Sequence, residues 1–202
     1  MDVSLESNFG TKEDGMMKAR KWKMKYSVKE ITSIGLVAAL IAVIGFVFYF
    51  IGSLFPVPGY KFVVFAPFLS FMLFIPVYKI KKTGVIAAIS SVFALIMASI
   101  TIFMSIAIFL TGICTEVLAF VLFRRYDTPL RTMLAVSIYP VFAVLWAFFV
   151  ADYFTGNALY QLSGGGLFLV VLCGVIYAFG FVGANISYKV VYKRLEKAEE
   201  MN

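Results

Sequence analysis

Long apolar segments alternate with short charged ones along most of this chain. A helix that crosses a membrane needs about 20 mostly apolar residues, and the charged residues divide the sequence into pieces near that length. The piece between Lys82 and Arg124 contains a single charge, Glu116, and is long enough for two helices with a break near residues 97–101. The pattern therefore predicts six membrane-spanning helices, over residues 31–51, 62–78, 83–97, 102–123, 132–151 and 166–188.

The composition excludes a soluble domain. Of the 202 residues, 62% are hydrophobic and 14% are charged, so the chain has more apolar surface than a soluble domain of this size could cover. We therefore expect an all-α integral membrane protein. Its six-helix domain would cover residues 27–197, between a basic tail at 1–26 and a short tail at 198–202.

The positively charged residues predict the orientation. Of the 18 Lys and Arg residues, all except Lys61 lie before the first segment or after the second, fourth and sixth segments. Because positive loops remain on the cytoplasmic side, we expect both termini inside the cell and loops near 52–61, 97–102 and 152–165 outside. The net charge of +7 then reflects multi-pass insertion in the cell membrane, with contact to anionic lipid, and gives no reason to expect nucleic acid.

The residue inventory argues against catalysis. The chain has no His, which excludes His-based metal sites and the Ser-His and Cys-His nucleophile pairs. Its two cysteines, Cys114 and Cys173, both lie inside predicted spans, so neither a disulfide nor a metal site is supported. We expect no enzymatic activity, no cofactor and no bound metal.

Glu116 is the one carboxylate inside the predicted spans. It lies about eight residues, or ~12 Å, from the inner end of its segment, which places it near the middle of the membrane. Because burying an ion there is costly, it should face a bundle interior or a watery cavity. Two roles stay open: contact with a ligand, or a structural hydrogen bond to another helix, for example to Asn185.

The predicted outer loops contain polar and aromatic side chains that could bind a small polar molecule. The candidates for substrate contact are Glu116 together with Lys61, Asp152, Tyr153 and Asn157. An aromatic ring that can stack, an amide and charges of both signs are typical of a binding pocket. They are equally typical of the aromatic belt at a membrane interface, so both interpretations stay open.

Small residues recur along the first predicted span, in "SIGLVAALIAVIG". Gly35, Ala38, Ala42 and Gly45 fall within a sector of roughly 80° on a helix, which forms one continuous groove. In lipid, close backbone approach through small residues is a main source of helix association. The groove therefore indicates either packing inside the bundle or a docking face for a helix of a partner.

Together these features resemble a known family. The basic N-terminus, the "AALIA" pattern with Ala38 and Ala42, the proline-bearing loop "PVPGYK" and six spans resemble the substrate-binding S component of an energy-coupling factor (ECF) transporter. The stretches "FIPVYKIKKTGV" and "LTGICTE" resemble more particularly the Trep_Strep, or MtsT-like, subgroup.

The resemblance implies a mechanism and partners. An S component binds a small water-soluble vitamin or related micronutrient outside the cell and associates with a transmembrane T component and two ATPase subunits. In that family the Ala-x-x-x-Ala face docks the T component, which carries over to Ala38 and Ala42. Two other classes stay open: a small membrane enzyme or assembly factor acting on lipid, and a stand-alone secondary transporter.

Overall fold

The computed structural model describes residues 26–52, 60–124, 126–155 and 166–200, and every regular element within these ranges is an α-helix. The helices are α2 (Val28–Gly52), α3 (Tyr60–Ile80), α4 (Val85–Ala98), α5 (Ile102–Phe123), α6 (Pro129–Thr155) and α8 (Gly166–Glu200). Each expected segment corresponds to one of them, and the expected break near 97–101 separates α4 from α5. In the described part of the chain, five helices are long and apolar enough to cross a membrane, whereas α4, with 14 residues, is shorter.

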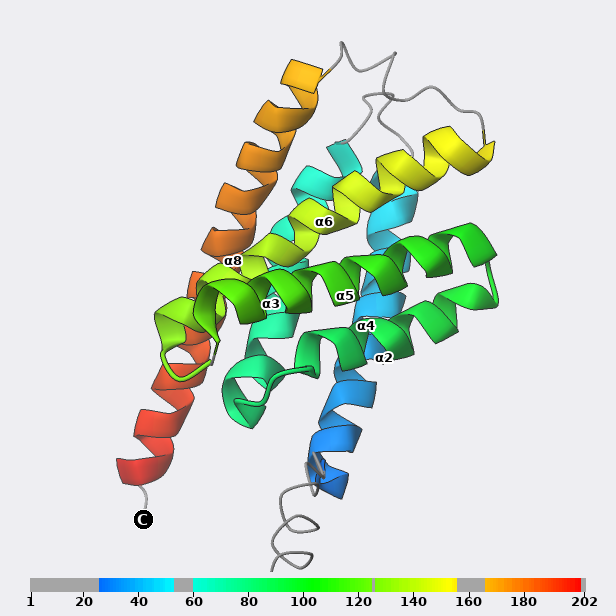
Figure 1. The fold of residues 1–202 in the computed structure, drawn as a ribbon. Helices are drawn as coiled ribbons and strands as arrows, with labels where there is room; N and C mark the ends of the chain where they lie inside the picture. The colour runs from blue at the N-terminus through cyan, green and yellow to red at the C-terminus, as the bar shows by residue number, and fades with distance from the viewer. Residues whose placement is uncertain (1–25, 53–59, 125, 156–165, 201–202) are drawn as a thin grey trace, which may run out of the picture.

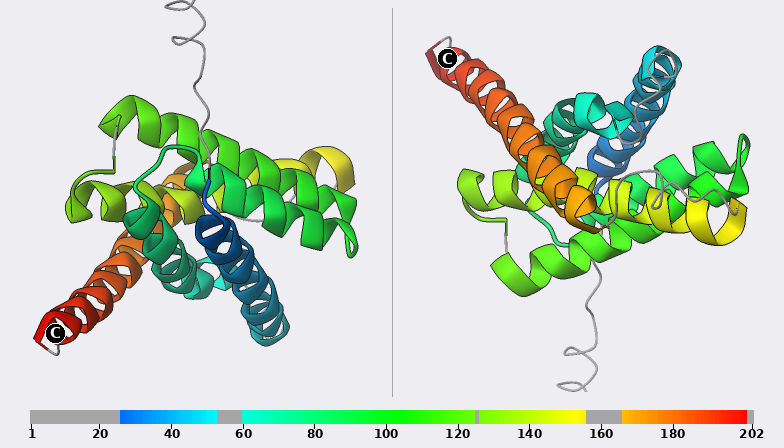
Figure 2. Two further views of the ribbon diagram at one scale, coloured as in Figure 1. Left: turned by 90° about the horizontal axis from the view of Figure 1, so that it is seen from below. Right: turned by 90° about the horizontal axis from the view of Figure 1, so that it is seen from above.

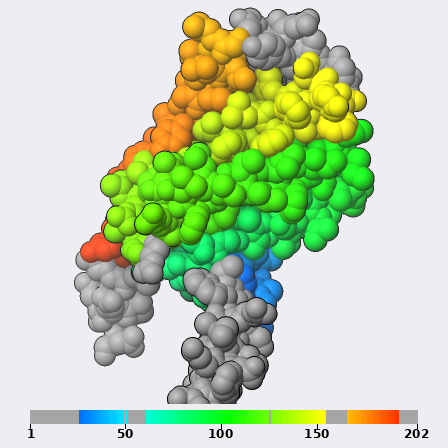
Figure 3. Space-filling view, viewed as in Figure 1, coloured from blue at the N-terminus to red at the C-terminus, as the bar shows by residue number. Residues whose placement is uncertain are grey.

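The six helices form two crossing layers. Helix α3 packs between α2 and α8 in one layer, and α5 packs between α4 and α6 in the other. The layers meet where α2 contacts α4 and where α3 and α8 contact α6. Figure 1 shows the helices of the second layer inclined steeply to α2, α3 and α8, and in each view of Figure 2 the two layers lie mainly in opposite halves of the picture. Figure 3 shows α4, α5 and α6 forming most of the face toward the viewer of Figure 1.

Apolar side chains cover the outside of this bundle as well as its interior. On α2, Ile34, Val37 and Ile41 are buried, while Leu36 and Val43 are more than 60% exposed. Both faces of such a helix are apolar, so its hydropathy shows little of the 3.6-residue period that marks a helix on a soluble protein. Hydropathy therefore predicts where these helices lie in the sequence but not which face of each points inward.

Glycine allows a close contact between α8 and α3. A Cβ atom added at Gly183 would meet the backbone carbonyl of Pro67, and one added at Gly180 would come within 2.9 Å of the Ser70 hydroxyl. The backbones approach because these glycines lack side chains, as expected where van der Waals packing drives helix association in lipid.

A proline in α6 is compensated by a side chain from the other layer. Pro140 lies inside the helix and has no N–H, so the carbonyl of Val136 loses its normal helical donor. The hydroxyl of Ser70 on α3 donates to that carbonyl across 3.3 Å. Satisfaction of freed backbone groups by neighbouring helices is what permits proline in a helix surrounded by lipid.

Candidate substrate-binding site

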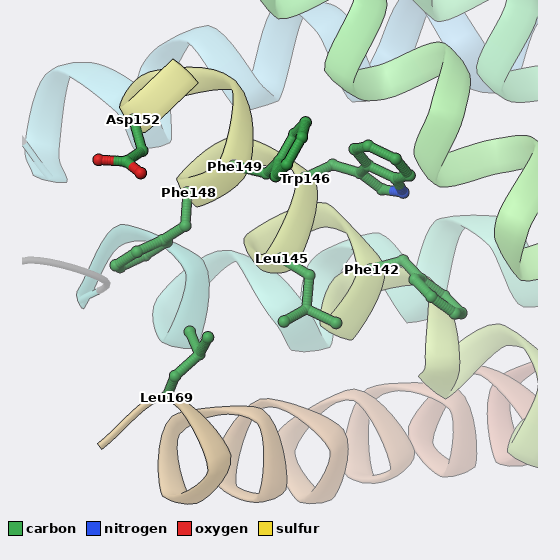
Figure 4. Close-up of a pocket in the computed structure, with 7 residues that line it drawn as sticks. All are labelled: Phe142, Leu145, Trp146, Phe148, Phe149, Asp152 and Leu169. Atoms are coloured by element: carbon green, nitrogen blue, oxygen red, sulfur yellow. The ribbon is translucent and has the colours of Figure 1, made fainter. Parts of the chain in front are cut away.

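A hollow of about 430 Å³ lies beside the C-terminal half of α6, next to the start of α8. We call it the α6–α8 hollow. Figure 4 shows Asp152 at one end and Phe142 at the other, with Leu169 reaching toward them from α8. Its lining is almost entirely apolar and consists of Phe142, Leu145, Trp146, Phe148, Phe149, Asp152 and Leu169.

The floor of the hollow is part of the helix packing. Phe148 is buried and belongs to a small core cluster that also includes Val144 of α6, Ala66 of α3, and Leu172 and Ile176 of α8. Three helices thus hold this side chain in place. The floor is therefore a preformed surface, which is typical of binding pockets for small molecules.

Aromatic rings continue from the hollow along one face of α6. Trp146 and Phe149 meet edge to face with their ring centroids 5.5 Å apart, and Phe149 stacks on Tyr153 at 5.9 Å. Residues spaced three and four apart lie on one side of a helix, so the row follows from the sequence positions alone. This spacing in the sequence could have identified Trp146 and Phe149 as parts of a site, but our candidates for substrate contact did not include them.

Asp152 carries the charge of the hollow. Its side chain is exposed and lies in the last turn of α6, which contains no basic residue. The C-terminal end of a helix has a partial negative charge, so the carboxylate and the helix end add to one another. This end of the hollow therefore attracts positive charge.

Glu116 does not line the α6–α8 hollow. Its carboxylate accepts hydrogen bonds from the backbone N–H groups of Gly84 at 2.7 Å, Ile86 at 3.0 Å and Ala87 at 3.3 Å. The hydroxyl of Tyr126 donates to the same carboxylate across 2.9 Å. The first N–H groups of a helix have no partner within the helix, and here Glu116 supplies one for the start of α4.

This arrangement shows which groups Glu116 contacts, whereas its expected depth in the membrane stays a prediction. The partners of the carboxylate come from the turn between α3 and α4 and from Tyr126. Asn185, the partner we had suggested, belongs to α8, which packs on α3 and α6. Of the two roles left open, the structural one accounts for these contacts.

Further contacts hold the same turn against α2. Lys82 forms a salt bridge with Glu30 at 2.8 Å, and the hydroxyl of Tyr26 donates to the carbonyl of Thr83 at 3.4 Å. We refer to Glu116, Tyr126, Lys82, Glu30 and Tyr26 as the Glu116 cluster. Burial and the nearby charge of Glu116 raise the pKa of the Tyr126 hydroxyl well above its ordinary value of 10.

The Glu116 cluster and the α6–α8 hollow are at opposite ends of α5 and α6. Phe103 near the start of α5 contacts Phe154 near the end of α6, with ring centroids 5.4 Å apart. Glu116 lies about 20 Å further along α5 from Phe103, at a rise of ~1.5 Å per residue. Glu116 and Asp152, which we had grouped as candidates for one site, therefore do not line the same cavity.

The remaining candidates have different surroundings. Tyr153 is exposed and stacks on Phe149, at the edge of the hollow. Lys61 is half-buried at the start of α3, and Asn157 lies outside the described residues. Within the described ranges, no group of three His, Cys, Asp or Glu side chains is placed to hold a metal ion.

Most of the small-residue face of α2 packs inside the bundle, which is one of the two interpretations that the sequence left open. Ala38 is 0% exposed and Ala42 is 6% exposed, and a Cβ atom at Gly45 would meet the ring of Phe65 at 3.0 Å. Only Gly35, among these four residues, has open space where a Cβ atom would lie. The close approach is made within the chain, by α3 and α4, because three small positions face the protein's own core.

Comparison with known proteins yields one structural likeness. No family model matches the chain, and no curated protein matches it. The fold is similar to a crystal structure of an S component of an ECF transporter, with a TM-score of 0.62 and 17% sequence identity. The likeness covers 88% of this chain and 96% of that one. The chain therefore has the helical fold seen in that S component.

Proposed function

We propose that this protein is the substrate-binding S component of an ECF-type transporter. The observation that supports the proposal most strongly is the shared fold, which extends over 96% of the S component it resembles. A preformed hollow of a size suited to a small molecule, about 430 Å³, is a second support. In this role the protein captures a small water-soluble compound, a vitamin or related micronutrient, outside the cell.

The proposal includes an orientation and partners. With both termini in the cytoplasm and all six helices in the cell membrane, the end of α6 and the start of α8 face outward, and so does the α6–α8 hollow. The Glu116 cluster then lies on the inner side, at the turn that carries Lys82. Uptake would require a T component and two ATPase subunits. The similarity of "LTGICTE" and "FIPVYKIKKTGV" to the Trep_Strep subgroup is part of this proposal.

The burial of Ala38 and Ala42 bears on how partners would dock. A T component could use this face only after α2 had separated from α3 and α4. The docking role of Gly35, Ala38, Ala42 and Gly45 stays a prediction, and it now includes that movement.

Co-purification and uptake together test the function. The tagged chain is co-expressed with the T component and the two ATPases of its own cell, and the membrane fraction is purified in detergent. We expect a complex of all four subunits, and uptake that is lost when the phosphate-binding Lys of the ATPases is changed to Ala although the complex still forms. A chain that binds none of these subunits, or that drives uptake alone, would contradict the proposal and favour a secondary transporter.

A further inference from the structure

We infer that the α6–α8 hollow takes an organic cation, a compact molecule with an aromatic or other apolar body and one protonated nitrogen. The inference rests on the proposed function and specifies the class of cargo. It is carried by the combination of an apolar lining with one carboxylate at its end.

The lining determines the body of the ligand. Six of the seven lining side chains are apolar, and four of the six are aromatic: Phe142, Trp146, Phe148 and Phe149. A sugar, a nucleotide phosphate or a free amino acid would bring several polar groups against rings that offer one hydrogen-bond donor in all, the indole N–H of Trp146. Each polar group left unpaired costs about 1–3 kcal/mol. A flat or branched apolar body loses no such bonds and gains area against Phe148 and Leu169.

The charges determine the polar group. Asp152 is the one ionisable side chain in the lining, and it lies where the C-terminal end of α6 adds a further partial negative charge. An anionic ligand would be repelled by both. A protonated amine would pair with the carboxylate through a charge-assisted hydrogen bond.

One small molecule can supply both the apolar body and the positive charge. Asp152 and Phe149 are three positions apart on α6, so the carboxylate and the ring lie on adjoining parts of one helical face. The about 430 Å³ of the hollow is within the usual range of small-molecule sites. The positive charge also makes such a compound soluble in water, as the cargo of a capture protein must be.

Three indoles of equal body and different charge test the inference. Tryptamine is cationic, tryptophol is neutral and indole-3-acetate is anionic at neutral pH. Their binding to the purified full chain is measured by calorimetry, with empty detergent micelles as the blank. We expect tryptamine to bind about tenfold more tightly than tryptophol, the gain typical of a hydrogen bond to a charged group, and indole-3-acetate to bind most weakly.

Three variants locate the effect, the first two of which are a matched pair. Asp152→Asn should remove the preference for tryptamine and leave the affinity for tryptophol nearly unchanged. Asp127→Asn changes another exposed aspartate, just before the other end of α6, and should leave the preference intact. Trp146→Leu should weaken all the indoles that bind, because it removes a ring from the lining.

The outcomes separate this inference from the proposed function. Equal affinity for the three indoles, no binding of tryptamine, or a preference that survives Asp152→Asn would overturn the cation assignment. The cation assignment is also overturned if phospholipid vesicles displace the indoles and the charge of the indole has no effect on its affinity. The hollow would then be a site for an acyl chain. Each preparation is also tested for the complex with the T component and ATPases, and that result alone decides the proposed function.

Discussion

The carboxylate of Glu116 on α5 and the hydroxyl of Tyr126, just before α6, form a hydrogen bond of 2.9 Å. The same carboxylate accepts three backbone N–H groups at the start of α4. One side chain thus ties α5 to the start of α4 and to the segment just before α6.

Replacing Glu116 should destabilise the fold and leave the hollow working. Glu116→Gln removes the charge and turns an amide NH₂ toward the N–H donors of α4, so we expect a loss of about 3 kcal/mol, as for a buried charged hydrogen bond left unmade. Urea or thermal unfolding in detergent measures it, with Glu30→Gln, which removes only the charge that pairs with Lys82, as the milder control. If Glu116→Gln instead kept full stability and lost tryptamine binding, Glu116 would be a ligand contact.

The raised pKa of Tyr126 predicts a decline of stability in alkali. Below pH 10, the ordinary pKa of tyrosine, the folded and unfolded chains both hold the phenolic proton, so the stability that this group contributes is fully present and does not change with pH. Above that pH the unfolded chain releases the proton while the buried, Glu116-bonded hydroxyl retains it, so stability falls as pH rises. Part of the same dependence comes from Tyr26, whose pKa is also raised by burial.

The variant Tyr126→Phe isolates this effect. It should lower stability at neutral pH by about 1 kcal/mol for the lost hydrogen bond and then show a shallower decline above pH 10 than the parent chain. Unfolding midpoints across the alkaline range supply the measurement, and the exposed Tyr192→Phe is the control. Parallel declines for Tyr126→Phe and the parent would show that other groups cause the alkaline loss.

Enlarging the buried alanines of α2 should disturb folding before it disturbs assembly. Ala38→Leu with Ala42→Leu inserts side chains into a packed interface, at a typical cost of about 1–3 kcal/mol for each. Ala39→Leu, on the exposed side of the same helix, should be nearly neutral. Stability and co-purification are measured together. A double variant that kept its stability but lost the T component would show that α2 opens and that its small-residue face is the docking surface.

The contact between α8 and α3 should not tolerate a methyl group. Gly183→Ala places a Cβ atom against the Pro67 carbonyl, so the helices must separate, and we expect a loss of about 2 kcal/mol or more. Gly174→Ala, on the same helix with open space at the Cβ position, should change stability by less than about 1 kcal/mol. Equal effects of the two substitutions on the thermal midpoint would mean that close approach at Gly183 is unimportant for this fold.

The sequence alone determined where the helices lie. A charge is costly in hydrocarbon wherever it occurs, so the positions of Lys82 and Arg124 limit the apolar segments without knowledge of any partner helix. The length of the segment between Lys82 and Arg124 predicted two helices with a break near residues 97–101, where α4 ends and α5 begins. The spacing of Trp146, Phe149 and Tyr153 also predicts that they lie on one face of a helix. The sequence likewise shows that Asp152 lies next to them in the chain.

Only the tertiary structure decided which faces point inward and which polar groups meet. Because both sides of α2 are apolar, hydropathy could not distinguish Ala38, which is buried, from Ala39, which is exposed. Glu116 finds its partners about thirty residues earlier in the chain, at N–H groups that every helix start leaves free, so no pattern of residue types marked them. The packing of α6 on α8 likewise created the hollow beside Asp152, since a cavity is a property of the distance between helices.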